Sequence, residues 1–193
     1  MARVCIDPGH AGGNTDPGAT NPVTGLQEAD VALTVSKLVA NYLDKAGCLV
    51  RLTRTEQEQS ETDDLQYRCD IANEWPADLF VSIHCNAATA RAKGFEVWTS
   101  PGETQGDALA TCVFNQIAAE FPDRLGRADY SDGDPDKESR FYVLTQTDCP
   151  ACLVEMAFIS NEEEAALLAN KTWLYRYARA IARGVTDYLQ EVG

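Results

Sequence analysis

The chain has 193 residues, of which 45% are hydrophobic and 24% are charged, as in a single globular domain and not a disordered chain. Its 30 Asp and Glu against 16 Lys and Arg leave a formal net charge of −14. This charge excludes nucleic acid as a partner, because binding phosphates needs a basic face. No stretch approaches the roughly 18 consecutive apolar residues of a membrane span, so we expect no membrane insertion.

Six short apolar runs, rich in Val, Ile, Leu, Phe and Cys, predict strands because they are too short for helices. They cover residues 3–7, 48–53, 79–84, 94–99, 141–145 and 152–158. Four longer stretches carry apolar residues at helical spacing, at residues 31–46, 63–75, 104–121 and 172–189. Gly47 is typical of a helix end, and Asn161 before three glutamates is typical of a helix N-cap.

This alternation of strands and helices predicts an α/β fold for residues 1–193. We expect one domain with a sheet of about six strands, mostly parallel or mixed, and helices on both faces. The longest polar stretch, residues 122–140, has Gly, Pro and Asp punctuation and predicts a loop that is either mobile or functional.

The seven cysteines are odd in number and lie in apolar runs, which favours reduced core thiols over a disulfide framework. Cys149 and Cys152 have the spacing of a redox pair, but they precede a predicted strand, so we expect a turn and a buried strand residue. An apolar strand follows Met1 directly, so no signal peptide is expected and the chain would stay in the cytosol.

The only two histidines, His10 and His84, each lie at or just after the end of a predicted strand. Because ligand sites gather at the carboxyl ends of strands in open α/β sheets, the two can converge on a metal. Each can equally be a core or turn histidine. A catalytic zinc site needs one more ligand, and Glu28 is the candidate carboxylate, although its position is also that of an acidic residue at a helix N-terminus.

Glu155 lies inside an apolar strand, where an unpaired carboxylate is costly to bury. A charge in such a place is normally paired or catalytic. Apolar surroundings raise the pKa of a carboxyl group and suit it to general acid and base catalysis. A pairing with a buried Arg, or a position at the strand edge, remains the alternative.

The chain resembles the zinc-dependent N-acetylmuramoyl-L-alanine amidases of the Amidase_3 type, found in bacterial autolysins, sporulation hydrolases and phage endolysins. The resemblance rests on several motifs in the right order across nearly the whole chain. These are IDPGHAGGNTDPGA, GLQEADVAL, VRLTR, RCDIAN, ADLFVSIHCNA, KGFEVW and YVLTQTDCPACLVEMAFISN.

The resemblance implies that His10, Glu28 and His84 bind one Zn²⁺ and that Glu155 is the catalytic glutamate. It implies hydrolysis of the amide between N-acetylmuramic acid and the L-alanine of the peptide stem, with peptidoglycan as the substrate. No covalent intermediate is expected. Asp7 and Asn86 flank the histidines, and we expect them to orient the imidazole rings.

The chain departs from the family pattern at two places, an extra Ala11 before Gly12-Gly13 and Thr145 where relatives often carry Arg. Both are expected near the substrate groove. The connection at residues 100–103 is too short for the inhibitory helix of regulated periplasmic relatives, so no activator protein is expected.

We expect residues 1–193 to form a single amidase catalytic domain without a separate cell-wall-binding domain. The protein would then be cytoplasmic until its release to the wall, as an endolysin is, or extracellular if the sequence is a truncated secreted enzyme. Three other functions remain open: a zinc peptidase of the stem, a non-catalytic wall-binding module, and a cytosolic metalloenzyme acting on an acylated small molecule.

Overall fold

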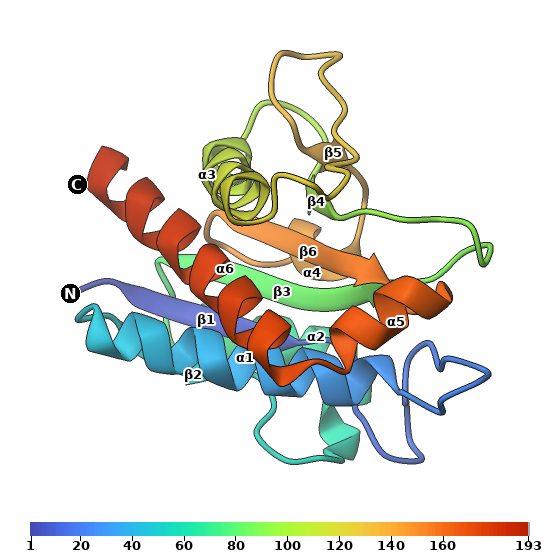
Figure 1. Cartoon of the computed structure of the whole chain (residues 1–193). Coiled ribbons are helices and arrows are strands. Elements are labelled where there is room, and N and C mark those ends of the chain that lie inside the picture. The colour runs from blue at the N-terminus through green and yellow to red at the C-terminus, as the bar shows by residue number, and fades with distance from the viewer. Residues whose placement is uncertain (193) are drawn as a thin grey trace.

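A six-stranded mixed sheet forms the centre of the computed structural model, which describes residues 1–192 (Figure 1). The strand order is β2-β1-β3-β6-β4-β5. Neighbours pair in parallel except β4 and β6, which are antiparallel. The strands are β1 (Arg3–Pro8), β2 (Leu49–Leu52), β3 (Leu79–Asn86), β4 (Glu96–Thr99), β5 (Lys137–Glu138) and β6 (Ala151–Phe158). The predicted α/β class and mixed sheet are confirmed.

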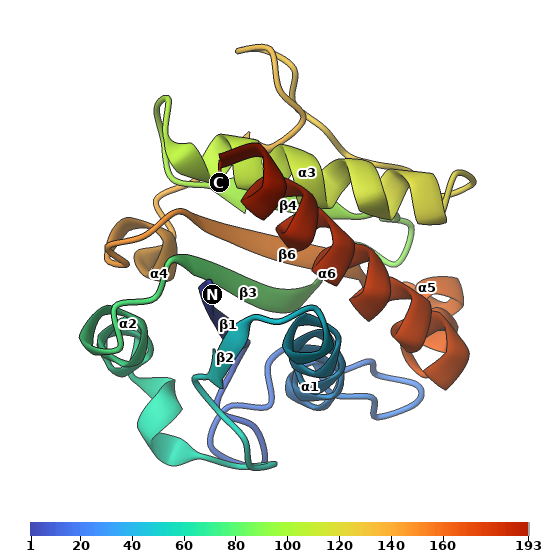
Figure 2. The same cartoon turned by 90° about the vertical axis from the view of Figure 1, so that its left-hand side faces the viewer.

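Helices cover both faces of the sheet, as predicted (Figure 2). Three long helices cover one face: α1 (Glu28–Lys45), α3 (Gln105–Glu120) and α6 (Lys171–Val192). Two shorter ones, α2 (Leu65–Glu74) and α4 (Tyr142–Thr145), lie together on the other face. A 3₁₀ turn (Ser60–Asp63) precedes α2, and α5 (Glu162–Leu168) follows β6.

The helix ends lie close to where the sequence predicts them. Gly47, with φ at 90°, follows the end of α1, since glycine adopts this backbone region without a steric penalty. Thr104 caps α3 in a capping box with Asp107, and the Asn161 side chain accepts a hydrogen bond from the Glu164 N–H at the start of α5.

Side chains of the central strands alternate between the two faces, because the side-chain period of a strand is two. On β3, Val81 and Ile83 join the large core under the three long helices, whereas Phe80 joins the smaller core under α2 and α4. Beyond Phe80 on that second face come Ser82 and His84. The site therefore lies on the more thinly covered face, toward the carboxyl ends of β1 and β3.

The segment 141–145 is a helical turn, α4, and the prediction of a strand there is wrong. Val143 and Leu144 are buried against α2 and β6, and the Thr145 hydroxyl donates to the Phe141 and Tyr142 carbonyls. Five residues are too few for periodicity to separate a strand from a helical turn, and packing against α2 decides. The sixth strand is instead β5, inside the polar segment predicted as a loop.

All seven thiols are free, and six of them are buried, as expected for reduced core cysteines. Cys149 lies half-buried before β6, and Cys152 is buried on it. Among residues 1–192, no helix has both the length and the apolar character that crossing a bilayer requires.

Candidate active site

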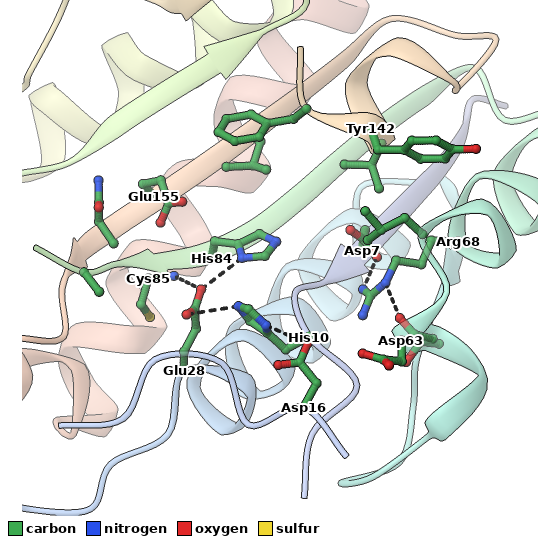
Figure 3. A pocket seen from close by; sticks show the side chains of 17 residues that line it. Asp7, His10, Asp16, Glu28, Asp63, Arg68, His84, Cys85, Tyr142 and Glu155 are labelled. Atoms are coloured by element: carbon green, nitrogen blue, oxygen red, sulfur yellow. Dashed lines mark hydrogen bonds and ion pairs between the residues drawn. The ribbon is translucent and has the colours of Figure 1, made fainter. Parts of the chain in front are cut away.

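Three side chains from separate elements converge at one end of the sheet (Figure 3). His10 follows β1, Glu28 is the first residue of α1, and His84 lies near the end of β3. The Nε2 atom of His10 lies 3.0 Å from Oε2 of Glu28, and Nδ1 of His84 lies 2.9 Å from Oε1. The carboxylate thus bridges the two imidazoles, whose ring centroids are 5.0 Å apart.

Two glycines make room for the imidazoles. A Cβ at Gly9 would lie 2.4 Å from Cε1 of His84, and one at Gly18 would lie 2.6 Å from Cδ2 of His10. Gly18 has a φ of 65°, which also favours glycine. His10 itself has a φ of 64°, an uncommon value for a residue with a side chain and one that occurs at functional sites.

Polar contacts orient two members of the cluster. The Nδ1 atom of His10 lies 2.8 Å from Oδ2 of Asp16, so the opposite ring nitrogen faces Glu28. The Glu28 carboxylate accepts hydrogen bonds from the N–H groups of Ala19 and Cys85, at 3.0 and 2.9 Å. These contacts hold the carboxylate against both histidines.

The charges in the cluster stabilise one another. Burial alone would raise the pKa of Glu28, but its hydrogen bonds with His10 and His84 hold that pKa far below the ordinary value. Burial opposes protonation of His10, yet its bonds to Glu28 and Asp16 raise the pKa of this imidazole. Glu28 is therefore an ionised carboxylate at neutral pH.

The cluster suits a zinc ion by the chemistry of its donors. Each residue offers a ligand atom, and these atoms all lie within 4.8 Å of one another. Two imidazole nitrogens and one carboxylate oxygen form the ligand set of many catalytic zinc sites, which leave a further position to water. Asp16 supplies the carboxylate contact to a ligand histidine that such sites typically contain.

Glu155 lies next to this cluster on β6, directly across from His84 in the strand pairing (Figure 3). Its Oε2 atom is buried and has no hydrogen-bond partner among residues 1–192. Burial is the main reason that the pKa of Glu155 is raised to about 7, while the nearby His84 partly offsets this rise. A carboxyl with a pKa near 7 can both accept and return a proton at neutral pH.

The expected roles of Asp7 and Asn86 are not those that the structure shows. Asp7 is fully buried and accepts hydrogen bonds from Arg68, Thr53 and Ser82 at 2.6 to 2.7 Å. The Asn86 amide donates to Glu96, at 2.9 Å. Both residues line the same cavity as the histidines, but Asp7 is engaged by Arg68 and two hydroxyls and Asn86 by Glu96, so neither contacts an imidazole ring.

Asp16 is the residue that contacts a histidine, and sequence reasoning did not single it out. It lies in the quoted IDPGHAGGNTDPGA motif, six residues after His10, so its presence in the loop is a signal that could have found it. Which loop carboxylate folds back onto the ring depends on the path of the glycine-rich loop.

A cavity of about 420 Å³ extends from the cluster between α2 and α4. Its far wall carries exposed apolar side chains, among them Leu65, Phe141 and Tyr142. The Phe141 ring packs edge-on against Trp98 at 5.5 Å, and the Tyr142 hydroxyl donates to Gln66. The wall is therefore held in place from both sides.

The side chains at the two departures from the family pattern do not line this cavity. Thr145 lines a separate hollow beside Arg140 and the N-terminus of α3, and Ala11 is fully buried. Neither side chain lines the cavity that contains the histidines, although Ala11 follows His10 and Thr145 belongs to α4, which borders that cavity.

The sequence matches the Amidase_3 family, described as N-acetylmuramoyl-L-alanine amidase, over residues 4–187. The chain belongs to this family. The predicted resemblance and the predicted enzyme class are therefore confirmed, and this chain is a hydrolase of the amidase class.

Individual relatives support the same conclusion. The chain is 33% identical to the N-acetylmuramoyl-L-alanine amidase CwlM of Bacillus licheniformis, over 96% of this chain and 68% of that protein. The structure of the amidase AmiC2 of Nostoc punctiforme superposes with a TM-score of 0.85 and 35% identity, covering 98% of this chain and 97% of that one.

A third relative was solved with a partner. The CwlD amidase of Clostridioides difficile, in complex with the GerS lipoprotein, superposes with a TM-score of 0.86 at 26% identity, over 99% of this chain and all of that chain. These likenesses extend over the whole of the fold described above.

Proposed function

We propose that the protein hydrolyses the amide between N-acetylmuramic acid and L-alanine in peptidoglycan with a zinc ion held by His10, Glu28 and His84. The observation that carries this proposal is the convergence of the three ligand atoms beside the unpartnered carboxyl of Glu155. Family membership supports the bond that is cut.

When bound, zinc supplies a Lewis acid that polarises the scissile carbonyl and lowers the pKa of a coordinated water. The chain's own contribution begins at Glu155, whose buried Oε2 accepts a proton from the attacking water. The same carboxyl then delivers that proton to the leaving nitrogen of L-alanine. Its pKa of about 7 suits both transfers.

The ligand residues and the cavity do the positioning. Asp16 and the N–H groups of Ala19 and Cys85 keep His10 and Glu28 in place through the reaction. The cavity between α2 and α4 opens beside Glu155 and gives the substrate room to bind with its scissile amide next to the cluster. No Ser or Cys nucleophile is needed, and Cys85, the thiol nearest the cluster, has a pKa raised well above its ordinary value by burial.

We also propose that the domain acts without an activator protein. The connection between β4 and α3 spans only residues 100–104 and holds no helix that could cover the site. The relative in complex with the GerS lipoprotein shows that partners occur in this fold, so the test is activity of the purified chain alone.

The decisive experiment digests purified peptidoglycan with the zinc-loaded protein, with and without a chelator, and identifies the new termini by mass spectrometry. The expected product is an intact stem with a free L-alanine amine, formed only in the untreated sample. A cut inside the stem would show a peptidase instead. Bound zinc without turnover would show a wall-binding module, and activity on soluble muramyl peptides only would show a small-molecule hydrolase.

A further inference from the structure

The polar segment 122–140 is attached to the sheet edge at both ends (Figure 1). The Phe95 N–H donates to the Leu125 carbonyl, and the Arg127 N–H donates to the Phe95 carbonyl, both at 2.9 Å. Farther along, β5 pairs with Trp98 and Thr99 of β4. The part between these attachments carries an unusual pair of aspartates, Asp134 and Asp136.

Asp136 is buried although it is an acid, with 3% of its surface exposed. Its Oδ2 atom accepts a hydrogen bond from the Thr99 hydroxyl at 2.5 Å. Its Oδ1 atom and the Oδ1 atom of Asp134 are both buried, and no donor in residues 1–192 reaches either of them. Unless the two acids share a proton, these two carboxyl oxygens are withdrawn from water without compensation.

None of the four cations of this segment pairs with the two aspartates. Lys137 and Arg127 both bind Glu96, at 2.8 and 2.6 Å, Arg124 binds Glu164, and Arg140 is exposed. No ion pair formed within the described part of the chain includes Asp134 or Asp136. Asp107, in the first turn of α3, adds a further negative charge nearby.

Buried carboxylates are normally paired or bound to a metal, since an isolated buried charge is very costly. Burial and the facing Asp134 carboxyl raise the pKa of Asp136 to about 8, so the pair can hold a proton when nothing else is bound. One proton neutralises only one of the two charges beside Asp107. A divalent cation neutralises both.

The ligand chemistry points to a hard cation, because the site offers carboxylate and hydroxyl oxygens. The segment reads Asp132-Gly133-Asp134-Pro135-Asp136, and an acid at every second position is the spacing of the first ligands in calcium loops. Gly133, with a φ of 116°, allows the turn between the acids.

We propose that Asp134 and Asp136, together with the Thr99 hydroxyl, bind a Ca²⁺ ion that fastens the 122–140 segment to β4. The position of the site gives this ion a consequence for the amidase site. It lies next to Lys137, whose ammonium binds Glu96, and Glu96 is the strand-pairing neighbour of Glu155. Fastening the segment therefore keeps a charged network in place beside the candidate catalytic carboxyl.

The test is a calorimetric titration of CaCl₂ into the zinc-loaded protein at neutral pH, with thermal melts at matched ionic strength. We expect one Ca²⁺ per chain with a Kd of roughly 0.1–1 mM, the range of extracellular calcium modules. At about ten times the Kd the Tm should rise by roughly 3–6 °C. Trypsin cleavage after Arg127 and Lys137 should slow in parallel.

Two variants make the test specific. Asp134→Asn should weaken Ca²⁺ binding at least tenfold, whereas Asp123→Asn removes the same charge from an exposed position of the same segment and should respond as the wild type does. A wild-type Tm unaffected by Ca²⁺, or an equal response in Asp134→Asn, would overturn the proposal. So would an Asp136→Asn variant that is more stable than the wild type while Ca²⁺ affects neither, which is the signature of a shared proton.

Discussion

The two faces of the sheet are built from the same strands but from different kinds of residue. Under α1, α3 and α6 the central strands β3 and β6 present apolar side chains, such as Ile83 and Val154. Toward α2 and α4 the adjacent positions, His84 and Glu155, are polar and border a cavity. Because strand side chains alternate, one residue packs in the core while its neighbour faces the cavity. Substitutions one position apart should therefore affect stability in one case and catalysis in the other.

The largest effect is expected on the polar face, at Glu155. Glu155→Gln keeps the shape of the side chain but removes the proton acceptor, so kcat on purified peptidoglycan should fall by about 10²–10⁴-fold. Zinc content and Tm should hold or rise, because an unpartnered buried carboxyl is removed. Turnover near the wild-type rate, with zinc bound, would show that Glu155 is not the general base.

Asp7 and Arg68 form a buried ion pair on this same face, with a separation of 2.7 Å. Arg68→Ala leaves the Asp7 carboxylate buried without its cation, and the free energy of unfolding should fall by about 3–5 kcal/mol. Urea unfolding measures this loss. A loss below about 1 kcal/mol would show that the hydroxyls of Thr53 and Ser82 suffice to stabilise Asp7.

The pair also predicts a pH dependence. Burial opposes ionisation of Asp7, but Arg68 and the two hydroxyls lower its pKa below the ordinary value of 3.8. The folded-state pKa is therefore below the unfolded one, so this stabilisation is present above about pH 4 and is lost as the pH falls through the folded value. Asn cannot be protonated in this way, so the Tm of Asp7→Asn should fall less than the wild-type Tm as the pH is lowered below 4.

On the apolar face the matched substitution is Ile83→Ala, next to His84 but fully buried in the large core. The lost contacts and the remaining cavity should cost about 2–5 kcal/mol of the free energy of unfolding. At temperatures where the variant stays folded, kcat should remain within a few-fold of the wild type. Loss of bound zinc from the folded variant would show that the two faces are coupled.

The smallest effect is expected at Asp16, which contacts His10 from the polar face but is itself partly exposed. Asp16→Asn should weaken zinc affinity by about 10–100-fold, the usual cost of losing a carboxylate that orients a ligand histidine. Competition with a chromogenic chelator measures it. Tm of the zinc-free protein should not change, and Asp123→Asn serves as the charge-matched control.

Local patterns could be predicted well where they are long or chemically distinctive. The strands β1, β3 and β6 are apolar runs, and α1, α3 and α6 have a sustained helical period, so each was predictable without tertiary context. The convergence of His10 and His84 followed from their positions at strand ends. Glu155 stood out as the acid inside an apolar strand, and its raised pKa agrees with that interpretation.

Short elements and pairings between distant loops could not be predicted in this way. Helix α4 has only four residues, and β5 has two, so their identities depend on contact with α2 and β4. Asp7 and Asp16 differ in role because Asp7 points toward Arg68, whereas the glycine-rich loop returns Asp16 to His10. No local sequence pattern predicts either contact.

By itself, the sequence determined the α/β class and the family, and it singled out His10, His84 and Glu155 as candidate site residues by residue type and local order. Glu28 was favoured as a ligand only through the family resemblance. Only the tertiary structure decided which carboxylate holds His10, what Asp7 pairs with, and that the acids of the 122–140 segment are buried together. The physical reason is that hydrogen bonds and charge pairs depend on distances between atoms, and those distances exist only once the strands and loops are packed.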